Sequence, residues 1–443
     1  MTDAPSSSQP SRYPSRADEQ PGLAARRAAL KLLDAVMRRG QPLETALHAA
    51  TQGIGGASGS SDRALAHAIA AETLRRVPDL DVLIDSVTPR PLPEDAKARM
   101  VIRMALTQML VLGTPPHAAI ATALPLVDGG PRKLVHGVLG ALGRAKAKLP
   151  EAITLPAGVA ERWAAQWGEG MAGAASVALA TRPPLDLTLR DVGETAIWLE
   201  RLGGTSLAPG HIRLDPDQDV TALAGFAEGA WWVQDVAASI AARLLGASEG
   251  GHVLDICAAP GGKTMQLASQ GWRVTALDKS KARLTRLVAN LERTGLTATV
   301  EAGDALKWSP EAPADAVLLD APCSATGIFR RHPDVLHRVG PRQVAEMAEI
   351  QEALLARAAD WIGTGGRLVY ATCSLERAEG EEQIERFLSG RPDFRCIALQ
   401  PDILPEGIVA SPEGWVRTTP ETLAASGGTD GFFIALLERS GAG

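Results

Sequence analysis

Two cysteines fifty residues apart are candidate nucleophiles. Cys323 lies in Asp320-Ala-Pro-Cys323-Ser324, and Cys373 lies in Ala371-Thr-Cys373-Ser374. Each follows an apolar run typical of a buried strand, so we expect both thiols at the carboxyl edge of a parallel sheet, where α/β proteins bind ligands. Because a thiolate is a strong nucleophile, the pair predicts covalent chemistry with a division of roles. The other two cysteines, Cys257 and Cys396, are expected to pack as small hydrophobic residues.

A glycine-containing loop after the first predicted strand of this sheet, 252–256, is the candidate cofactor site. Its end resembles a phosphate-binding P-loop, but that motif requires glycine where Cys257 stands, and Pro260 lacks an amide donor. The loop also lacks the GxGxxG spacing that admits a dinucleotide pyrophosphate. S-adenosyl-L-methionine, a cofactor without phosphate, is the remaining class.

Acidic residues at successive strand ends fit that cofactor. Asp278 ends the second strand, where a carboxylate can accept hydrogen bonds from both ribose hydroxyls, and Asp304 follows the third, where we expect the adenine amine. Adjacent glycines in the loop allow close approach of the methionine portion. The predicted cofactor-binding residues are Cys257, Ala258, Ala259, Pro260, Gly261, Gly262, Lys263, Asp278, Asp304 and Asp320.

A basic cluster follows the Cys323 segment within the acidic half of the chain. It contains Arg330, Arg331 and His332, and we expect these residues, together with Lys263, to contact phosphate groups of a ligand. The alternative is a solvated loop.

The composition is that of a multidomain protein of a reducing compartment. The chain has 443 residues, of which 45% are apolar and only 4 are cysteine. The cysteines form neither a disulfide framework nor a zinc-ligand spacing, so no metal site is expected. The first twenty residues lack the apolar core of a signal peptide, and no run has the length of a membrane span. We therefore expect a cytoplasmic protein that has a disordered tail and no membrane partner.

Charge is segregated along the chain. Lys and Arg outnumber Asp and Glu by 17 to 10 over residues 21–150, whereas residues 151–443 carry 26 against 38. A basic domain suits phosphate binding followed by delivery to a second domain, although a solvated helical surface would look the same.

The elements that must position these residues divide the chain into a helical part and an α/β part. Helical spacing of apolar residues predicts helices over 23–37, 64–75, 101–112 and 131–142. From residue 251 strands and helices alternate, with predicted strands at 252–256, 273–277, 299–302, 316–319, 367–371, 394–399 and 432–437, apolar on both faces as in a parallel sheet. We predict a tail over 1–20, an all-α helical bundle over 21–150, a connecting helical and small α+β segment over 151–235, and an α/β Rossmann-like domain over 236–443.

Three blocks of the sequence closely resemble a known family. Residues 255–264, 320–327 and 371–374 resemble signature blocks of the RNA cytosine carbon-5 methyltransferases, and the closing 428–433 resembles that family's last strand. The helical part, with Asp62-Arg63-Ala64-Leu65, resembles the NusB-like RNA-binding domain of bacterial 16S ribosomal RNA methyltransferases of the Sun/RsmB type.

The resemblance implies an S-adenosylmethionine-dependent methyltransferase, acting as a monomer on cytosine carbon 5 of 16S ribosomal RNA. A thiolate would attack carbon 6 to activate carbon 5, and Asp320 would hydrogen-bond the ring N3 and amino group. DNA cytosine methyltransferases use the cysteine of a Pro-Cys motif, which would favour Cys323, whereas the RNA family uses that of Thr-Cys. The resemblance thus implies Cys373 as nucleophile and Cys323 in product release. A transfer RNA cytosine methyltransferase and a non-catalytic RNA-binding ribosome assembly factor are the alternatives.

Overall fold

The computed structural model describes residues 21–55 and 59–440, so the predicted disordered tail lies outside the described residues. The chain divides into two compact units, one ending at Thr154 and one beginning at Leu155. Residues 155–235, predicted as a connecting segment, thus fall in the same unit as the large sheet. In the described part of the chain, no helix combines the length and apolar character that a bilayer crossing requires.

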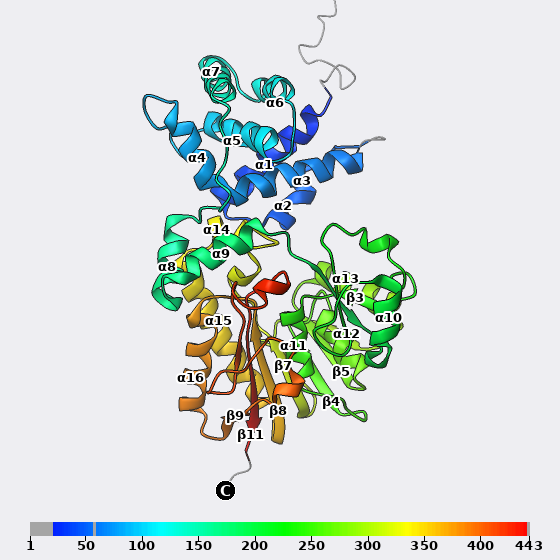
Figure 1. The fold of residues 1–443 in the computed structure, drawn as a ribbon. Helices are drawn as coiled ribbons and strands as arrows, with labels where there is room; N and C mark the ends of the chain where they lie inside the picture. The colour runs from blue at the N-terminus through cyan, green and yellow to red at the C-terminus, as the bar shows by residue number, and fades with distance from the viewer. Residues whose placement is uncertain (1–20, 56–58, 441–443) are drawn as a thin grey trace, which may run out of the picture. The chain divides into compact units, whose positions relative to one another are not determined.

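The first unit is all α, as the sequence predicts (Figure 1). Its α-helices are α1 (Leu23–Arg39), α2 (Leu43–Ala50), α3 (Gly59–Arg75), α4 (Val77–Ser86), α5 (Lys97–Leu110), α6 (Pro116–Ala123) and α7 (Gly130–Arg144). Residues three and four apart on α1, such as Ala25, Ala29, Leu32 and Val36, are fully buried and form one stripe toward the core. The short helices α2, α4 and α6 were not predicted, because each has too few turns to display a helical period.

The second unit begins with two helices and a small sheet. Helices α8 (Ala157–Trp167) and α9 (Gly170–Ala180) precede strands β1 (Leu185–Leu189), β2 (His211–Leu214) and β3 (Trp231–Val233), with α10 (Thr195–Leu202) between β1 and β2. The strands pair antiparallel in the order β2-β1-β3. The small α+β character of this segment was predicted, whereas β3 was missed because only three residues extend before helix α11 (Val236–Arg243).

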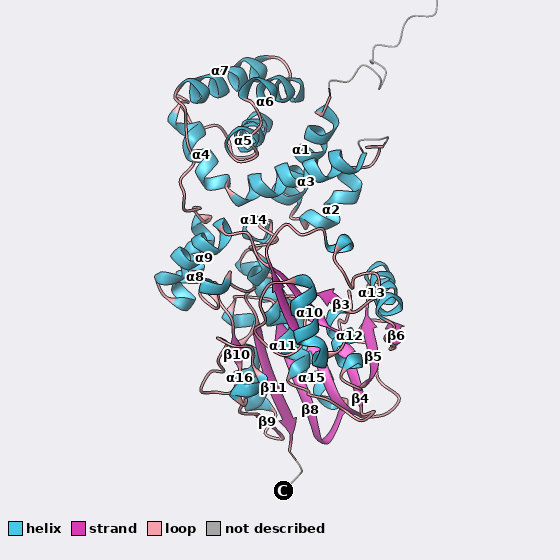
Figure 2. Ribbon diagram, turned by 45° about the vertical axis from the view of Figure 1, so that its right-hand side comes forward, coloured by secondary structure: helices cyan, strands magenta, loops and turns pink. Residues whose placement is uncertain are grey.

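The large sheet has the order β10-β11-β8-β7-β4-β5-β6, with β9 paired to β11 (Figure 2). Its strands are β4 (His252–Ile256), β5 (Arg273–Asp278), β6 (Thr299–Ala302), β7 (Ala314–Asp320), β8 (Ile362–Thr372), β9 (Phe394–Cys396), β10 (Val416–Arg417) and β11 (Phe433–Arg439). Strands β4 to β8 pair parallel, whereas β11 pairs antiparallel with each of its neighbours, β8, β9 and β10. The expectation of an all-parallel sheet is therefore wrong at one edge, because buried antiparallel strands are as continuously apolar as parallel ones.

Helices cover both faces of this sheet. Helices α11 and α12 (Gly262–Ser269) pack on one face against Val253, Leu318 and Val369, and α13 (Lys281–Thr294) packs beside α12. Helices α15 (Pro341–Asp360) and α16 (Glu381–Gly390) pack on the other face, and the short α14 (Val335–Arg338) precedes α15. The alternation of side chains along each strand supplies the two cores.

Candidate active site

The predicted catalytic and cofactor-binding residues lie at one edge of the sheet, at the carboxyl ends of β4, β5, β7 and β8. Asp320 ends β7 and is paired in register with Ala371 of β8, so the two cysteine segments leave neighbouring strands side by side. The Sγ atoms of Cys323 and Cys373 lie 3.5 Å apart. The structure thus brings together the two thiols that the sequence separates by fifty residues.

Two cavities meet at this edge. The larger, of about 330 Å³, is lined by Asp278, Asp304 and Cys323 among others, and the second, of about 290 Å³, by Gln234 and Lys263. Asp320 and Cys373 line both cavities. A molecule in each cavity would therefore meet the other beside the Cys373 sulfur.

The larger cavity has the features expected of a nucleoside site. Asp278 accepts hydrogen bonds from the Ala259 amide at 3.2 Å and the Ser280 amide at 2.8 Å, which fix its carboxylate at the end of β5. The exposed Asp304 accepts from the Leu306 amide at 3.1 Å. Partly exposed Leu306 and Ile350 add apolar surface at the same cavity.

The loop between β4 and α12 needs its first glycine. Gly261 has a φ of 106°, and a Cβ there would lie 2.9 Å from Cγ of Leu287. Of the other predicted cofactor residues, Cys257 lines the larger cavity, whereas Ala258, Pro260, Gly262 and Lys263 line the second. Burial, the largest cause, raises the pKa of Cys257 to about 12, so this thiol stays protonated.

Lys263 is buried between acidic and aromatic neighbours. Its Nζ forms an ion pair with Asp320 Oδ2 at 2.8 Å and lies 5.5 Å from the centre of the Phe432 ring. Burial favours the neutral amine, but the attraction of Asp320 outweighs it and raises the pKa of Lys263. Lys263 is therefore a fixed cation inside the site, close enough to Cys373 for the two charges to interact.

The two cysteines have different surroundings. Cys323 lines only the larger cavity, and its hydrogen bond with Cys373, together with burial, raises its pKa well above that of a free thiol. Cys373 lies where both cavities meet and is half-buried. Cys323 is therefore a thiol that keeps its proton, whereas Cys373 lies beside the Lys263 cation.

Glu379 joins the two cysteine loops and was not predicted as a site residue. This fully buried carboxylate accepts from the Ser324 amide at 2.8 Å and from Gln351 Nε2 at 3.0 Å. The hydroxyls of Ser324 and Ser374, which directly follow the two cysteines, also donate to it. Burial raises the pKa of Glu379 despite these donors. Because its partners lie in other segments of the chain, no sequence pattern indicated its burial.

Helix α8 is tied to the same region through Glu376. The buried Glu376 carboxylate accepts from Trp163 Nε1 at 3.0 Å and Gln166 Nε2 at 2.8 Å, and Arg162 pairs with it at 3.1 Å. Trp167 Nε1 donates to the Leu375 carbonyl at 2.8 Å. The two tryptophans thus anchor the segment that follows Cys373.

The predicted basic cluster does not form one exposed surface. Arg330 is only 2% exposed and donates to the Gly427 carbonyl at 2.7 Å, so the expectation that it contacts RNA phosphate does not fit its burial. Arg331 lines the second cavity and pairs with Asp235 at 3.2 Å and Asp430 at 3.3 Å. His332 is half-buried. Asp235 also caps helix α11 by accepting from the Ala237 amide at 2.9 Å.

Asp255, at the end of β4, is a buried acid behind the cofactor loop. It is fully buried and accepts from the Thr264 hydroxyl at 2.5 Å, while its Oδ1 has no hydrogen-bond partner. Burial is the main cause that raises its pKa to about 7. Among the described residues, no group of three or more His, Cys, Asp or Glu is placed to hold a metal ion.

Known proteins resemble this chain over nearly its whole length. Residues 242–438 match the family described as 16S rRNA methyltransferase RsmB/F, and residues 23–144 match the NusB family. Ribosomal RNA small subunit methyltransferase B of Klebsiella pneumoniae strain 342 is 33% identical over 442 residues, which cover 93% of this chain and 97% of that protein. The protein of the same name from Xanthomonas campestris pv. campestris is 36% identical over 440 residues, 95% of this chain and 98% of its own length.

Solved structures share the fold. The crystal structure of PH0851 has a TM-score of 0.71 at 25% identity and covers 95% of this chain and 99% of its own. NSun6 from Pyrococcus horikoshii, solved with SFG, has a TM-score of 0.56 at 20% identity and covers 65% of this chain and 99% of its own.

Replacing Glu379 by glutamine should loosen both cysteine loops. Glutamine can keep an oxygen at the Ser324 amide, but its NH₂ group then replaces the oxygen that accepts from the Ser324 and Ser374 hydroxyls. Both hydroxyls lose a charged acceptor and must turn, so we expect a loss of about 1–3 kcal/mol in stability. Faster hydrogen exchange should appear in peptides spanning 322–328 and 371–377. The exposed Glu382→Gln in the first turn of the following helix α16 is the control, and equal melting and exchange of the two variants would contradict the bridging role.

Asp255 should make stability depend on pH. Its folded pKa of about 7 exceeds the unfolded value near 4, so below pH 4 both states are protonated and the group has no effect. As pH rises from 4 to 7 the unfolded state ionises first, and the native protein loses up to about 4 kcal/mol. Asp255→Asn should therefore gain stability relative to the natural chain across this window, as measured by urea unfolding at several pH values. Exposed Asp402→Asn should track the natural chain; a constant difference between Asp255→Asn and the natural chain would exclude the assignment.

Proposed function

Because this chain belongs to the RsmB/F family of 16S rRNA methyltransferases, we propose that it transfers a methyl group from S-adenosyl-L-methionine to carbon 5 of a cytosine in 16S ribosomal RNA. The observation that carries the proposal is the meeting of two cavities at Cys373 and Asp320. One cavity suits a nucleoside cofactor and the other a flipped base, and a nucleophile stands between them.

The larger cavity fits the cofactor. Asp278 offers carboxylate oxygens for ribose hydroxyls, Asp304 stands at the place proposed for the adenine amine, and Leu306 and Ile350 supply apolar surface for the ring. When bound, S-adenosylmethionine supplies an electrophilic methyl group on a sulfonium. Of the loop at residues 257–263, Cys257 lines this cavity, and its other lining residues line the second cavity.

The second cavity fits an unstacked cytosine. Asp320 lines it and can accept a hydrogen bond from the exocyclic amine, while its ion pair with Lys263 fixes the orientation of the carboxylate. Phe432 presents a ring at the same cavity. Arg331, held by Asp235 and Asp430, remains the residue of the basic cluster that we propose for contact with RNA here.

The proposed reaction begins at the Cys373 sulfur. The Cys373 thiolate, beside the Lys263 cation, attacks carbon 6 of the base to form a C–S bond and leaves carbon 5 electron-rich. After carbon 5 has taken the methyl group, its proton passes to water and the C–S bond breaks, so that Cys373 leaves as a thiolate. Cys323, a protonated thiol 3.5 Å away, can hydrogen-bond or protonate that sulfur and so assist release.

Each region of the chain has a proposed role in this reaction. We propose residues 21–150 as the RNA-binding domain, 151–235 as the connecting segment, and 236–443 as the methyltransferase domain of a cytoplasmic monomer. The match of residues 23–144 to the NusB family and the basic charge of 21–150 support the first assignment.

Bisulfite sequencing of ribosomal and transfer RNA tests the function directly. Cells that lack the protein should lose one 5-methylcytosine in 16S ribosomal RNA, and the purified protein with labelled cofactor should restore it. Loss of a transfer RNA site instead would assign the other substrate class, and no turnover on either RNA would leave a non-catalytic factor.

Single cysteine variants should separate the two thiols. Cys373→Ala should abolish methyl transfer, because no sulfur reaches carbon 6, whereas Cys323→Ala should accumulate a protein–RNA adduct that survives SDS electrophoresis. Cys396→Ala, away from both cavities, should behave as the natural protein. Activity in Cys373→Ala but not in Cys323→Ala would reverse the two roles.

Asp278→Asn should weaken cofactor binding by about tenfold or more, because a charged acceptor is lost at the ribose hydroxyls. Isothermal titration with S-adenosylhomocysteine measures the affinity, and a melting curve without ligand separates this loss from unfolding. Asp402→Asn is the matched control. Unchanged affinity in a folded Asp278→Asn protein would remove Asp278 from the site.

A further inference from the structure

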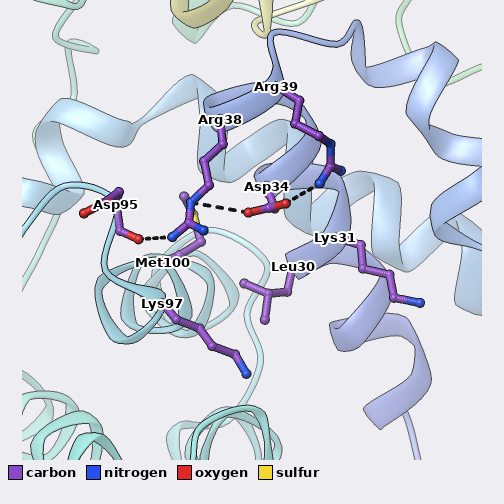
Figure 3. A pocket seen from close by; sticks show the side chains of 8 residues that line it. All are labelled: Leu30, Lys31, Asp34, Arg38, Arg39, Asp95, Lys97 and Met100. Atoms are coloured by element: carbon purple, nitrogen blue, oxygen red, sulfur yellow. Dashed lines mark hydrogen bonds and ion pairs between the residues drawn. The ribbon is translucent and has the colours of Figure 1, made fainter.

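A pocket on the helical unit has no part in the chemistry above (Figure 3). It lies between helix α1 and the start of α5 and has a volume of about 260 Å³. Leu30 and Met100 give it an apolar lining, and the other lining residues are charged: Lys31, Asp34, Arg38, Arg39, Asp95 and Lys97. Four cations thus face two carboxylates around an apolar surface.

The two arginines of this pocket are held in place from within it. Arg38 Nε lies 3.4 Å from Asp34 Oδ1, and Arg39 pairs with the other oxygen of the same carboxylate. Arg38 also donates to the backbone carbonyl of Asp95. One carboxylate therefore orients two guanidinium groups, each of which retains further N–H donors for a ligand.

The two lysines of this pocket are not neutralised. Within residues 21–55 and 59–440, the side chain of neither Lys31 nor Lys97 makes a hydrogen bond or an ion pair. Figure 3 shows both side chains extended with no marked interaction. Both residues are exposed. They come from different helices, so the rigid packing of α1 and α5 on the common core sets their separation.

A nucleotide combines a charged phosphate with the less polar faces of a base and a ribose, and this pocket combines cations with an apolar lining. Lysine and arginine attract phosphate, and aliphatic side chains such as Leu30 and Met100 can contact the face of a base or a ribose. An acidic peptide would also suit the charge. RNA is favoured because residues 21–150 carry 17 cations against 10 acids, whereas residues 151–443 carry 26 against 38. The net negative charge of residues 151–443 repels a polyanion, so the net attraction of RNA has to come from residues 21–150.

We propose that this pocket binds one nucleotide of the RNA substrate, with phosphate at Lys31 and Lys97 and the base or ribose on Leu30 and Met100. The proposal rests on the proposed function for the identity of the polymer. It adds a second RNA contact on a different unit from the reaction centre, so its loss should weaken binding without changing the chemical step.

The first test measures RNA affinity of the full chain at several salt concentrations, with a labelled 16S ribosomal RNA transcript. Lys31→Ala/Lys97→Ala should bind about tenfold more weakly, and the slope of log affinity against log salt should fall by about one to two. Lys133→Ala/Lys148→Ala removes the same charge at exposed positions outside the pocket. An affinity and slope like those of the natural chain, or an equal loss in the control, would overturn the proposal.

The second test needs no variant and so does not depend on folding. Acetylation of the natural protein followed by mass spectrometry should show Lys31 and Lys97 protected by the transcript and Lys148 unprotected. Absence of protection at both lysines would overturn the proposal. Methyl transfer to the same transcript separates the two hypotheses: natural protein that methylates it but shows no protection refutes only the pocket, whereas no methyl transfer refutes the proposed function.

Lys31→Ala/Lys97→Ala should raise KM and leave kcat unchanged.

Discussion

The buried carboxylate of Glu379 is the interaction on which the reaction centre depends. Strands β7 and β8 bring the two cysteine segments to one edge, but parallel pairing ends there and leaves two free loops. Glu379 closes the gap by accepting from the residues that directly follow both cysteines, Ser324 and Ser374. A charge at this depth is costly unless it is fully hydrogen-bonded, so the loops must adopt the arrangement that satisfies it. The 3.5 Å separation of the sulfurs is a consequence of that requirement.

Asp320 has a comparable role between the two cavities. It lines both, and its partner Lys263 extends from the helix that begins with the cofactor loop. One ion pair therefore connects the end of β7 with α12, at the point where the two cavities meet. The same pair keeps a cation next to Cys373, which explains why a lysine expected at RNA phosphate lies buried in the centre of the site.

Much of this site could be predicted because its residues stand at strand ends. Asp278, Asp320 and both cysteines follow apolar runs, and a parallel sheet collects such positions at one edge. Glu379 could not be found in this way, because its partners come from two other segments and its neighbours in sequence are acidic. Burial of Arg330 was equally hidden, since the carbonyl that it binds belongs to Gly427, almost one hundred residues away. The antiparallel pairing near one edge of the sheet was not predicted, because the pattern of apolar residues indicates that a strand is buried but not the direction in which it runs.

The tight contact between Gly327 and Gly431 bears on the order in which the protein matures. The Gly431 amide donates to the Gly327 carbonyl at 2.9 Å, and a Cβ on Gly327 would lie 1.9 Å from the Gly431 carbonyl oxygen. The loop that carries Cys323 is thus completed by a segment next to β11, which follows the whole helical unit in sequence. During synthesis on the ribosome the helical unit therefore emerges first and is free to fold before a competent reaction centre exists. A nascent chain of this enzyme can gain its folded helical unit well before it can modify RNA.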